Sequence, residues 1–449
     1  DPAPPLLCLA ADEDAAAYLQ SDLEHLLGTD ATVLRFPATH QSPYDAEQIA
    51  DSTPLTERAD VLQQVTGDFD GIIVTSVQAV SELVPPPDTV QRETMSIDVG
   101  DEVPPDTLVE LLLDQGFKRV EFVEHPGQLA QRGGILDIFP YAGEYPIRIE
   151  FFGDEVDALR EFDPQTQRSV SRLKTARLVP NLERDDQQRR PIPFFAYLPG
   201  ATLFATFDEA RIREAAEAQF QEAATAHRQA METVAAESMD GDDADLDLPQ
   251  PRHRYLDRDG LESVLEENSR LLFGTFADAA SNGQAIETLD VGAAPQPSFN
   301  SNLDLVREQV QANRDRGLRT FVLCDSHGQS SRLRDLLDVE IDQGMARLLV
   351  ESLHEGFEWN GDAMPEGGLA VYTDHQIFNR YHRPSTKKRA KYQGGLTVRD
   401  VKNLNLGDFV VHVDHGIGTF DGMKKITVRG KKQEAVRLNF ADGDVLYVN

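Results

Sequence analysis

The sequence is poor in cysteine and tryptophan, and it has no long apolar run. Only 2 cysteines and 1 tryptophan occur in 449 residues, which excludes a small secreted scaffold held by disulfides. Cys8 and Cys324 each lie inside an apolar run, so we expect two buried free thiols in strands. No apolar run reaches the roughly 18 residues that span a bilayer, and the start DPAPP lacks the features of a signal peptide. We therefore expect a cytoplasmic chain with no membrane partner.

Positive charge is also scarce. The chain has 77 acidic and 43 basic residues, a net charge of −34, and only 10 of the basic residues are lysines. This balance argues against a generic nucleic-acid surface, because phosphates need a positive field. It suits a solvated acidic shell in strong salt, which suggests a halophilic source. Residues 387–449 are different, since 12 basic and 7 acidic residues give +5 and eight of the lysines lie there. We expect this segment to have a partner of its own.

The sequence also lacks a phosphate-binding loop. Apolar runs alternate with helical spacing from Leu6 to Val84, which predicts a parallel α/β layer with strands at 6–10, 31–36 and 71–75. Such a layer binds ATP through G-x-x-x-x-G-K-[ST], and no such motif occurs. Residues 154–157 spell a helicase-like D-E-V-D, but a carboxylate pair without the loop cannot position a nucleotide. We expect a degenerate domain with no catalytic residue, no metal and no cofactor in this chain.

A strand is expected at 118–124, and three short apolar runs separated by turn residues follow between Gln131 and Ser169. They predict an antiparallel meander with strands at 135–139 and 147–152, the second ending in a two-residue type II′ turn at Gly153-Asp154. The period of two separates an inner face from an outer face. The inner face has Ile147, Ile149 and Phe151, and the outer face has Arg148, Glu150 and Phe152.

The outer face allows two interpretations. Arginine beside a large aromatic side chain is typical of a protein-binding hot spot. The plainer alternative is that another domain covers Phe152 and that Arg148 pairs with Glu150.

This segment resembles the small domain shared by UvrB and the transcription-repair coupling factors. The shared pattern is an Arg-Gly start, an apolar D-I-F-P strand, a strand with R-x-E-x-F and a D-E-V hairpin, matched here by Arg132-Gly133, 136–140, 148–152 and 154–156. The resemblance implies that this surface binds UvrA. The implied contact residues are Arg132, Gly133, Arg148, Glu150 and Phe152.

The middle of the chain is expected to complete the first layer and to start a second. A strand at 202–207, a long helix at 208–238 and strands at 269–276 and 284–289 would close the first, with an acidic loop at 238–251 that lacks EF-hand spacing. A second α/β unit begins at Asn302, with a helix to 314 and strands at 319–324, 347–351 and 368–373. Ser326 and His327 lack G-x-S-x-G, so Ser326 is predicted to cap a helix.

The C-terminal segment is predicted to be all β. A basic linker at 386–392 is either a solvated charge run or a contact with nucleic acid or an acidic partner. Five short strands, interrupted by turns that include Asp421-Gly422, then predict a small SH3- or Tudor-like barrel, which we expect to be truncated at Asn449. The strands are expected at 408–413, 418–423, 424–428, 434–440 and 444–448. His412 and His415 lack a third ligand, so a metal site is not expected.

The pattern G-D-x-V-V-H-x-x-H-G-I-G in this segment resembles the RNA-polymerase-interacting domain of the coupling factors and the CarD regulators. The resemblance implies that an edge strand pairs with the β subunit of RNA polymerase. The implied contact residues are Lys424, Lys425, Ile426 and Val428, with Ile426 as the apolar anchor.

The order of these parts implies the N-terminal part of a coupling factor. We expect an α/β domain in two parts (1–94 and 184–297), a UvrA-binding domain (95–183), a non-catalytic α/β domain (298–385), a linker (386–403) and the barrel (404–449). The family implies a longer protein that uses ATP and Mg²⁺ to move on DNA through a motor module, to displace stalled polymerase and to recruit UvrA. Two alternatives remain: a UvrB-like helicase fragment, and a CarD-type transcription regulator.

Overall fold

The computed structural model describes residues 4–449 apart from 29–30, 40–41, 43, 45–51, 67–68, 144, 165, 182–189, 238–247, 275–288, 361–366, 382–406, 413–415, 429–430, 441–444 and 449. Only the backbone is described for residues 52, 235–237, 411–412, 416, 423, 425–428, 431–435 and 447–448. The chain divides into two compact units, Asp1–Arg389 and Ala390–Asn449. Among the described residues, no helix is long and apolar enough to cross a membrane.

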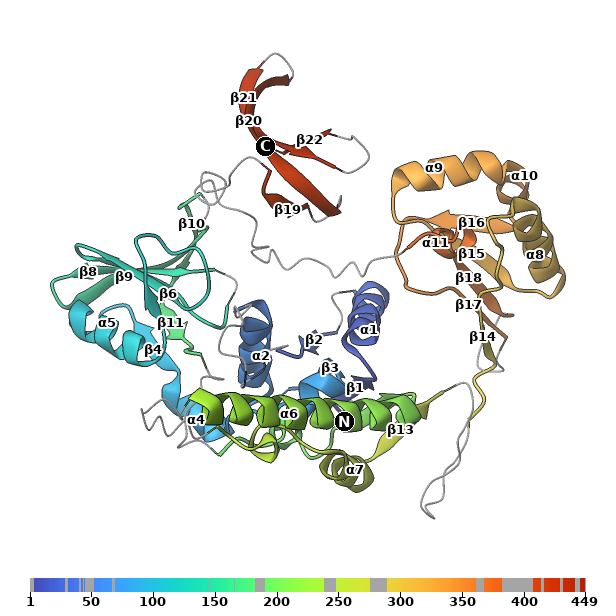
Figure 1. Ribbon diagram of the computed structural model, residues 1–449. Coiled ribbons are helices and arrows are strands. Elements are labelled where there is room, and N and C mark those ends of the chain that lie inside the picture. Colours follow the sequence, from blue (N-terminus) through green and yellow to red (C-terminus); the bar gives the residue numbers. More distant parts are fainter. Residues whose placement is uncertain are drawn as a thin grey trace. The chain divides into compact units, whose positions relative to one another are not determined.

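A five-stranded parallel sheet combines two distant segments of the chain (Figure 1). Its order is β13-β12-β1-β3-β2, and every pairing is parallel. The expected strands near 6–10, 31–36, 71–75, 202–207 and 269–276 are present, whereas the one expected at 284–289 lies almost entirely outside the described residues. The strands are β1 (Leu6–Ala10), β2 (Val33–Phe36), β3 (Ile72–Ser76), β12 (Leu203–Phe207) and β13 (Arg270–Phe273).

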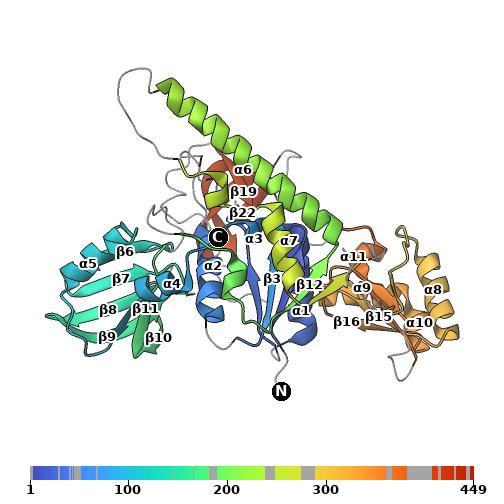
Figure 2. The same ribbon diagram turned by 90° about the horizontal axis from the view of Figure 1, so that it is seen from below.

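Helices cover both faces of this sheet. Helix α1 (Glu13–Leu27) packs on the face that carries Cys8, Ala10 and Val74. The opposite face carries Leu7 and Leu9 and packs against the other helices, across which the long α6 runs (Figure 2). Those helices are α2 (Ser52–Val65), α3 (Val77–Ser81), α6 (Glu209–Glu237) and α7 (Arg258–Glu267), and short 3-10 turns occur at Phe194–Tyr197 and Pro251–His253. Cys8 and Cys324 are buried free thiols, as predicted, but only Cys8 lies in a strand, because the strand before Cys324 ends at Leu323.

The predicted meander is the centre of a six-stranded sheet with the order β10-β9-β8-β7-β6-β5. Helix α5 (Pro105–Asp114) covers its inner face through Leu108 and Leu112, which pack with Ile149 in one core (Figure 1). The strands are β5 (Lys118–Arg119), β6 (Gln128–Arg132), β7 (Ile135–Phe139), β8 (Ile147–Phe152), β9 (Glu155–Phe162) and β10 (Ser169–Leu173). Before the sheet, the chain forms helix α4 (Pro87–Glu93) and strand β4 (Met95–Asp98). After the sheet it forms β11 (Thr175–Leu178), which pairs antiparallel with β4.

One strand of this region was predicted too long. The apolar run 118–124 forms a strand only at Lys118–Arg119. The reason is that the segment after it covers part of the outer face, where Val123 packs with Ala130 and Phe139. Burial against a sheet face and burial within a strand leave the same apolar pattern in the sequence.

A mixed five-stranded sheet with the order β14-β17-β18-β15-β16 follows. Strands β15 (Arg319–Leu323), β16 (Ala346–Leu349) and β18 (Leu369–Thr373) are parallel, and β14 (Ala293–Pro295) and β17 (Phe357–Trp359) are antiparallel. The helices are α8 (Leu303–Asp315), α9 (His327–Leu336), α10 (Asp338–Asp342) and α11 (Asp374–Ile377). Buried Glu358 accepts hydrogen bonds from Tyr372, Gln309 and Arg316 at 2.5 to 2.8 Å. This network satisfies a carboxylate inside the fold.

The C-terminal unit is a four-stranded antiparallel sheet in its described part, with the order β19-β20-β21-β22. The strands are β19 (Phe409–His412), β20 (Gly416–Val428), β21 (Lys431–Asn439) and β22 (Val445–Val448). The predicted break between the strands at 418–423 and 424–428 is wrong, because the two form one strand. Asp421-Gly422 is a bulge in it, since the register shifts between Phe420 and Met423 and Gly422 has φ +85°.

Candidate protein-binding surface

Asp137 is the centre of the outer face of the six-stranded sheet. It lies on β7 between Leu136 and Ile138, which point into the core, so the alternation of the strand directs it outward. Its exposed fraction is nevertheless only 1%. Two arginines cover it, and a buried carboxylate of this kind needs such partners.

Arg148 is the first of these partners and is the residue directly opposite Asp137 on β8. Its Nε donates to Asp137 Oδ1 at 2.7 Å, and a terminal nitrogen donates to Oδ2 at 2.9 Å and to Gln167 Oε1 at 3.0 Å. The guanidinium lies 4.4 Å from the centroid of the Phe162 ring. The hydrogen bonds to Asp137 raise the pKa of Arg148. Only 17% of the Arg148 side chain is exposed, so neighbouring residues cover most of it.

Arg132 is the second partner and is more open to solvent. It lies at the end of β6, donates to Asp137 Oδ2, and keeps 39% of its side chain exposed. Its guanidinium lies 4.9 Å from the centroid of the Phe122 ring, and Phe122 is itself 45% exposed. A cation thus stands on the surface with a carboxylate on one side and an aromatic ring on another.

Glu150 has a different partner from the one in the plainer interpretation. Arg160 on β9 approaches it with Nε at 3.2 Å from Oε1, while Arg148 bonds Asp137. The predicted pairing of Arg148 with Glu150 is therefore wrong. The reason is the register, which places Asp137 directly across from Arg148 and leaves Glu150 opposite Ile135 and Ala158.

Phe152 ends β8 and is 81% exposed. The two-residue turn Gly153-Asp154 follows, because Phe152 pairs with Glu155. Gly153 has φ +66° and Asp154 has no positive φ, which is the pattern of the predicted type II′ turn. The D-E-V-D sequence is thus a turn and the start of β9, as predicted.

Gly133 contributes through its backbone. It has φ +60° in the turn between β6 and β7, a conformation that favours glycine. The neighbouring Gly134 accepts a hydrogen bond from the backbone N–H of Phe151 at 2.8 Å. This turn therefore lies beside the end of β8, and Arg132 and Phe152 share one end of the sheet.

The structure brings the predicted residues together on one face and adds four that were not predicted to belong to it. The added residues are Phe122, Asp137, Phe162 and Gln167. Of these, only Asp137 left a signal, as a charge within the apolar run I-L-D-I-F. The others come from segments whose position depends on the complete sheet.

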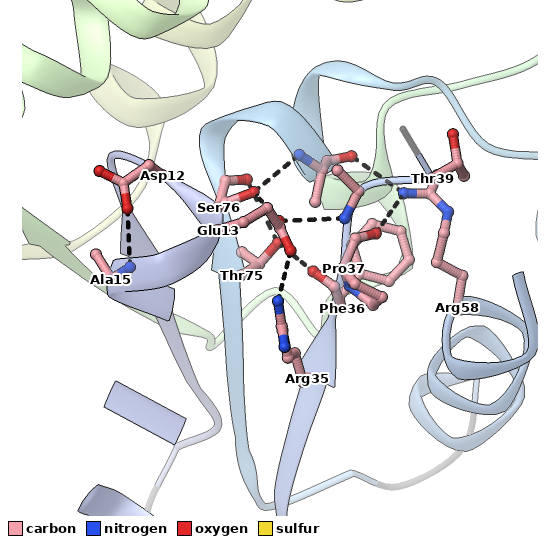
Figure 3. A network of polar contacts seen from close by, with 12 residues as sticks. Asp12, Glu13, Ala15, Arg35, Phe36, Pro37, Thr39, Arg58, Thr75 and Ser76 are labelled. Carbon is pink, nitrogen blue, oxygen red and sulfur yellow. Dashed lines mark hydrogen bonds and ion pairs between the residues drawn. The ribbon is translucent and has the colours of Figure 1, made fainter. Parts of the chain in front are cut away.

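A second polar cluster fills the carboxyl edge of the parallel sheet (Figure 3). Glu13, the first residue of α1, accepts hydrogen bonds from Arg35 at 2.6 Å, from the backbone N–H of Ala38 at 3.2 Å and from the Ser76 hydroxyl. Asp12 caps the same helix by accepting from the Ala15 N–H at 2.8 Å. Carboxylates thus occupy the helix end at which nucleotide-binding folds hold phosphate.

A third cluster lies at the carboxyl ends of β15 and β18. Ligand atoms of Asp325, Asp374 and His375 are within 4.8 Å of one another. Arg380 already pairs with Asp374 at 2.7 Å, and His375 Nε2 is 2.9 Å from the His354 carbonyl. No sequence motif indicates this group, because Asp325 lies some fifty positions before Asp374 and His375. Nearby, Ser326 Oγ accepts from the Gln329 N–H at 3.3 Å, so it caps α9 as predicted.

The contact residues expected in the C-terminal unit are described mainly by their backbone. Lys424 to Val428 pair with β21 through one edge of β20, and no described strand pairs with their other edge. Lys424 is exposed. The side chains of Lys425, Ile426, Val428 and His412, and all of His415, lie outside the described residues.

Two segments of the chain match known domain families. Residues 95–183 match the family described as the UvrB interaction domain, and residues 404–449 match the CarD-like/TRCF RID domain. The first match contains the outer face of the six-stranded sheet around Asp137, and the second contains the four-stranded sheet.

The relatives that match most of the chain are transcription-repair-coupling factors. The transcription-repair-coupling factor of Myxococcus xanthus is 28% identical over 99% of this chain and 42% of its own length. The same factor of Bacillus subtilis is 23% identical over 99% and 42%, and that of Staphylococcus aureus is 24% identical over 90% and 39%. The chain thus spans about two fifths of the length of these relatives. The resemblance found in the sequence, to the N-terminal part of a transcription-repair coupling factor, is confirmed.

Proposed function

We propose that the chain is the N-terminal part of a factor that couples stalled transcription to excision repair. In this proposal the outer face around Asp137 binds UvrA, and the C-terminal sheet binds the β subunit of RNA polymerase. The observation that carries it is the presence of both matched domains in one chain. The exposed Phe152 and Arg132 support the first half, because aromatic and arginine side chains dominate protein-binding hot spots.

The first α/β domain, formed by 1–94 and 184–297, is proposed to be a scaffold without nucleotide. Glu13 and Asp12 supply negative charge where phosphates would otherwise bind. A hollow of about 420 Å³ beside them is lined by Asp12, Glu214 and Glu222 but by only one basic residue, Arg211. Such a site repels ATP. We also propose no cofactor for this chain.

The C-terminal sheet is proposed to complete a small barrel and to use the edge of Lys424 to Val428 for strand addition. Main-chain groups on the edge away from β21 would pair with the polymerase, and Ile426 would supply specificity. We further propose that the complete protein carries an ATP- and Mg²⁺-dependent motor that moves on DNA. The acidic chain described here would not bind DNA itself.

Two binding assays and one activity assay test the proposal. The chain should capture UvrA, and Phe152→Ala should weaken that capture by about tenfold or more. Leu111→Ala on α5 is the matched control, because Leu111 is 47% exposed on a helix that covers the other face. A fragment of the polymerase β subunit should bind the chain independently of Phe152.

The outcomes separate the alternatives. Hydrolysis of ATP by this chain would favour a UvrB-like helicase. Polymerase binding without UvrA binding would favour a CarD-type regulator. Binding of neither partner would refute the proposal.

A further inference from the structure

The two arginines of the outer face differ in the donors they leave for a partner. Arg148 donates hydrogen bonds from Nε and one terminal nitrogen to Asp137 and Gln167, and its guanidinium packs on the Phe162 ring. Arg132 touches Asp137 through one terminal nitrogen and is more than twice as exposed. A partner protein therefore reaches the guanidinium of Arg132 first.

Asp137 connects the two arginines. A carboxylate can accept hydrogen bonds from both, and its buried position fixes where each guanidinium lies. Phe122 holds the Arg132 guanidinium from a second direction. The planar group is thus oriented before binding, so less conformational freedom is lost when a partner docks.

We infer that Asp137 is a positioning residue for partner binding and that Arg132, Phe122 and Phe152 form the contact layer. This rests on the proposed binding of UvrA. It also fixes the chemistry of the partner, which should present a carboxylate to Arg132 and an apolar pocket to Phe152. Phe122 becomes a contact residue that the sequence pattern did not include.

The test is a double-mutant cycle on UvrA binding by the whole chain. Arg132→Ala should weaken binding about 10- to 30-fold, and Asp137→Asn about 10-fold. In the Arg132→Ala background, Asp137→Asn should have almost no further effect, because its contribution passes through Arg132. Arg177→Ala, which removes an exposed arginine from β11, is the control and should bind like wild type.

The cycle also distinguishes positioning from a general structural role. A general structural role would make Asp137→Asn equally harmful in both backgrounds, and that result would overturn the inference. Wild-type binding by Asp137→Asn would overturn it as well. If Asp137→Asn does not fold, Arg132→Lys replaces it: a lysine keeps the charge but not the oriented planar group, so binding should fall nearly as far as with Arg132→Ala. Wild-type binding by Arg132→Lys would then be the contrary result.

The proposed function can fail separately. If wild-type chain does not bind UvrA, both the function and this inference fall. If Phe152→Ala weakens binding and Phe122→Ala does not, the function stands and the extended contact layer is wrong.

Discussion

Replacing Arg148 with alanine should destabilise the six-stranded sheet, although the sequence pattern presents Arg148 as a surface contact. The change removes both hydrogen bonds to Asp137 and the packing on Phe162. Asp137, whose exposed fraction is 1% with both arginines in place, then has one partner fewer. Removing one member of a buried ion pair costs about 3 to 5 kcal/mol. Arg132 remains on Asp137 and water can enter beside it, so we expect about 2 to 3 kcal/mol.

Native-state hydrogen exchange is the appropriate assay, because a chain with several domains does not unfold in two states. Backbone amides of β7 and β8 should exchange about 30- to 140-fold faster, which is the same free energy at 1.4 kcal/mol per tenfold. The matched control is Arg160→Ala. Arg160 and Glu150 are 30% and 31% exposed, so their pair should contribute less than about 1 kcal/mol.

A second substitution tests the physical cause. If the uncompensated carboxylate is the source of the loss, adding Asp137→Asn to Arg148→Ala should restore part of the protection. Equal exchange in Arg148→Ala and Arg160→Ala, or a further loss in the double variant, would refute the reasoning.

Three other predictions concern the remaining parts of the chain. Ile426→Arg should weaken binding to a polymerase β-subunit fragment about tenfold or more, whereas Lys424→Ala should alter mainly the salt dependence of that binding. Equal binding by wild type and Ile426→Arg would mean that another edge is used. Burial raises the pKa of Cys8 and Cys324 from 9.0 to about 12, so thiol reagents at pH 8 should react with them only on unfolding. Because these thiols ionise first in the unfolded chain, their contribution to the free energy of unfolding should be level below about pH 9 and fall towards pH 12. With a net charge of −34, the melting temperature should rise from dilute buffer to molar KCl, and a maximum in dilute buffer would contradict salt adaptation.

The faces of the meander could be predicted because strand alternation is a local property. Ile147 and Ile149 are buried and Phe152 is exposed, as the period of two required. The partner of Arg148 could not be predicted in the same way. Asp137 lies eleven positions away, and the loop between β7 and β8 sets which residue faces it. Glu150 was the nearer carboxylate in sequence, and the register excluded it.

The Asp421-Gly422 dipeptide shows a second limit. A tight turn and a β-bulge both use a glycine with positive φ, so the local sequence is the same for either. The choice depends on β21, which continues to pair with β20 on both sides of Gly422. Two predicted strands thereby became one. The C-terminal contact edge nevertheless falls within β20.

The charge of the outer face fits the chemistry that an acidic chain can use for recognition. Within the ion pairs of this face, Arg132, Arg148 and Arg160 meet Asp137 and Glu150, and these five groups sum to +1 in a chain of −34. So small an excess gives little long-range steering, and salt at about 0.1 M screens charges beyond about 10 Å. Contacts at hydrogen-bond distance are screened far less. Specificity should therefore come from an arginine held in place by a buried carboxylate and from the apolar surface of Phe152, and substitutions there should act mainly on dissociation.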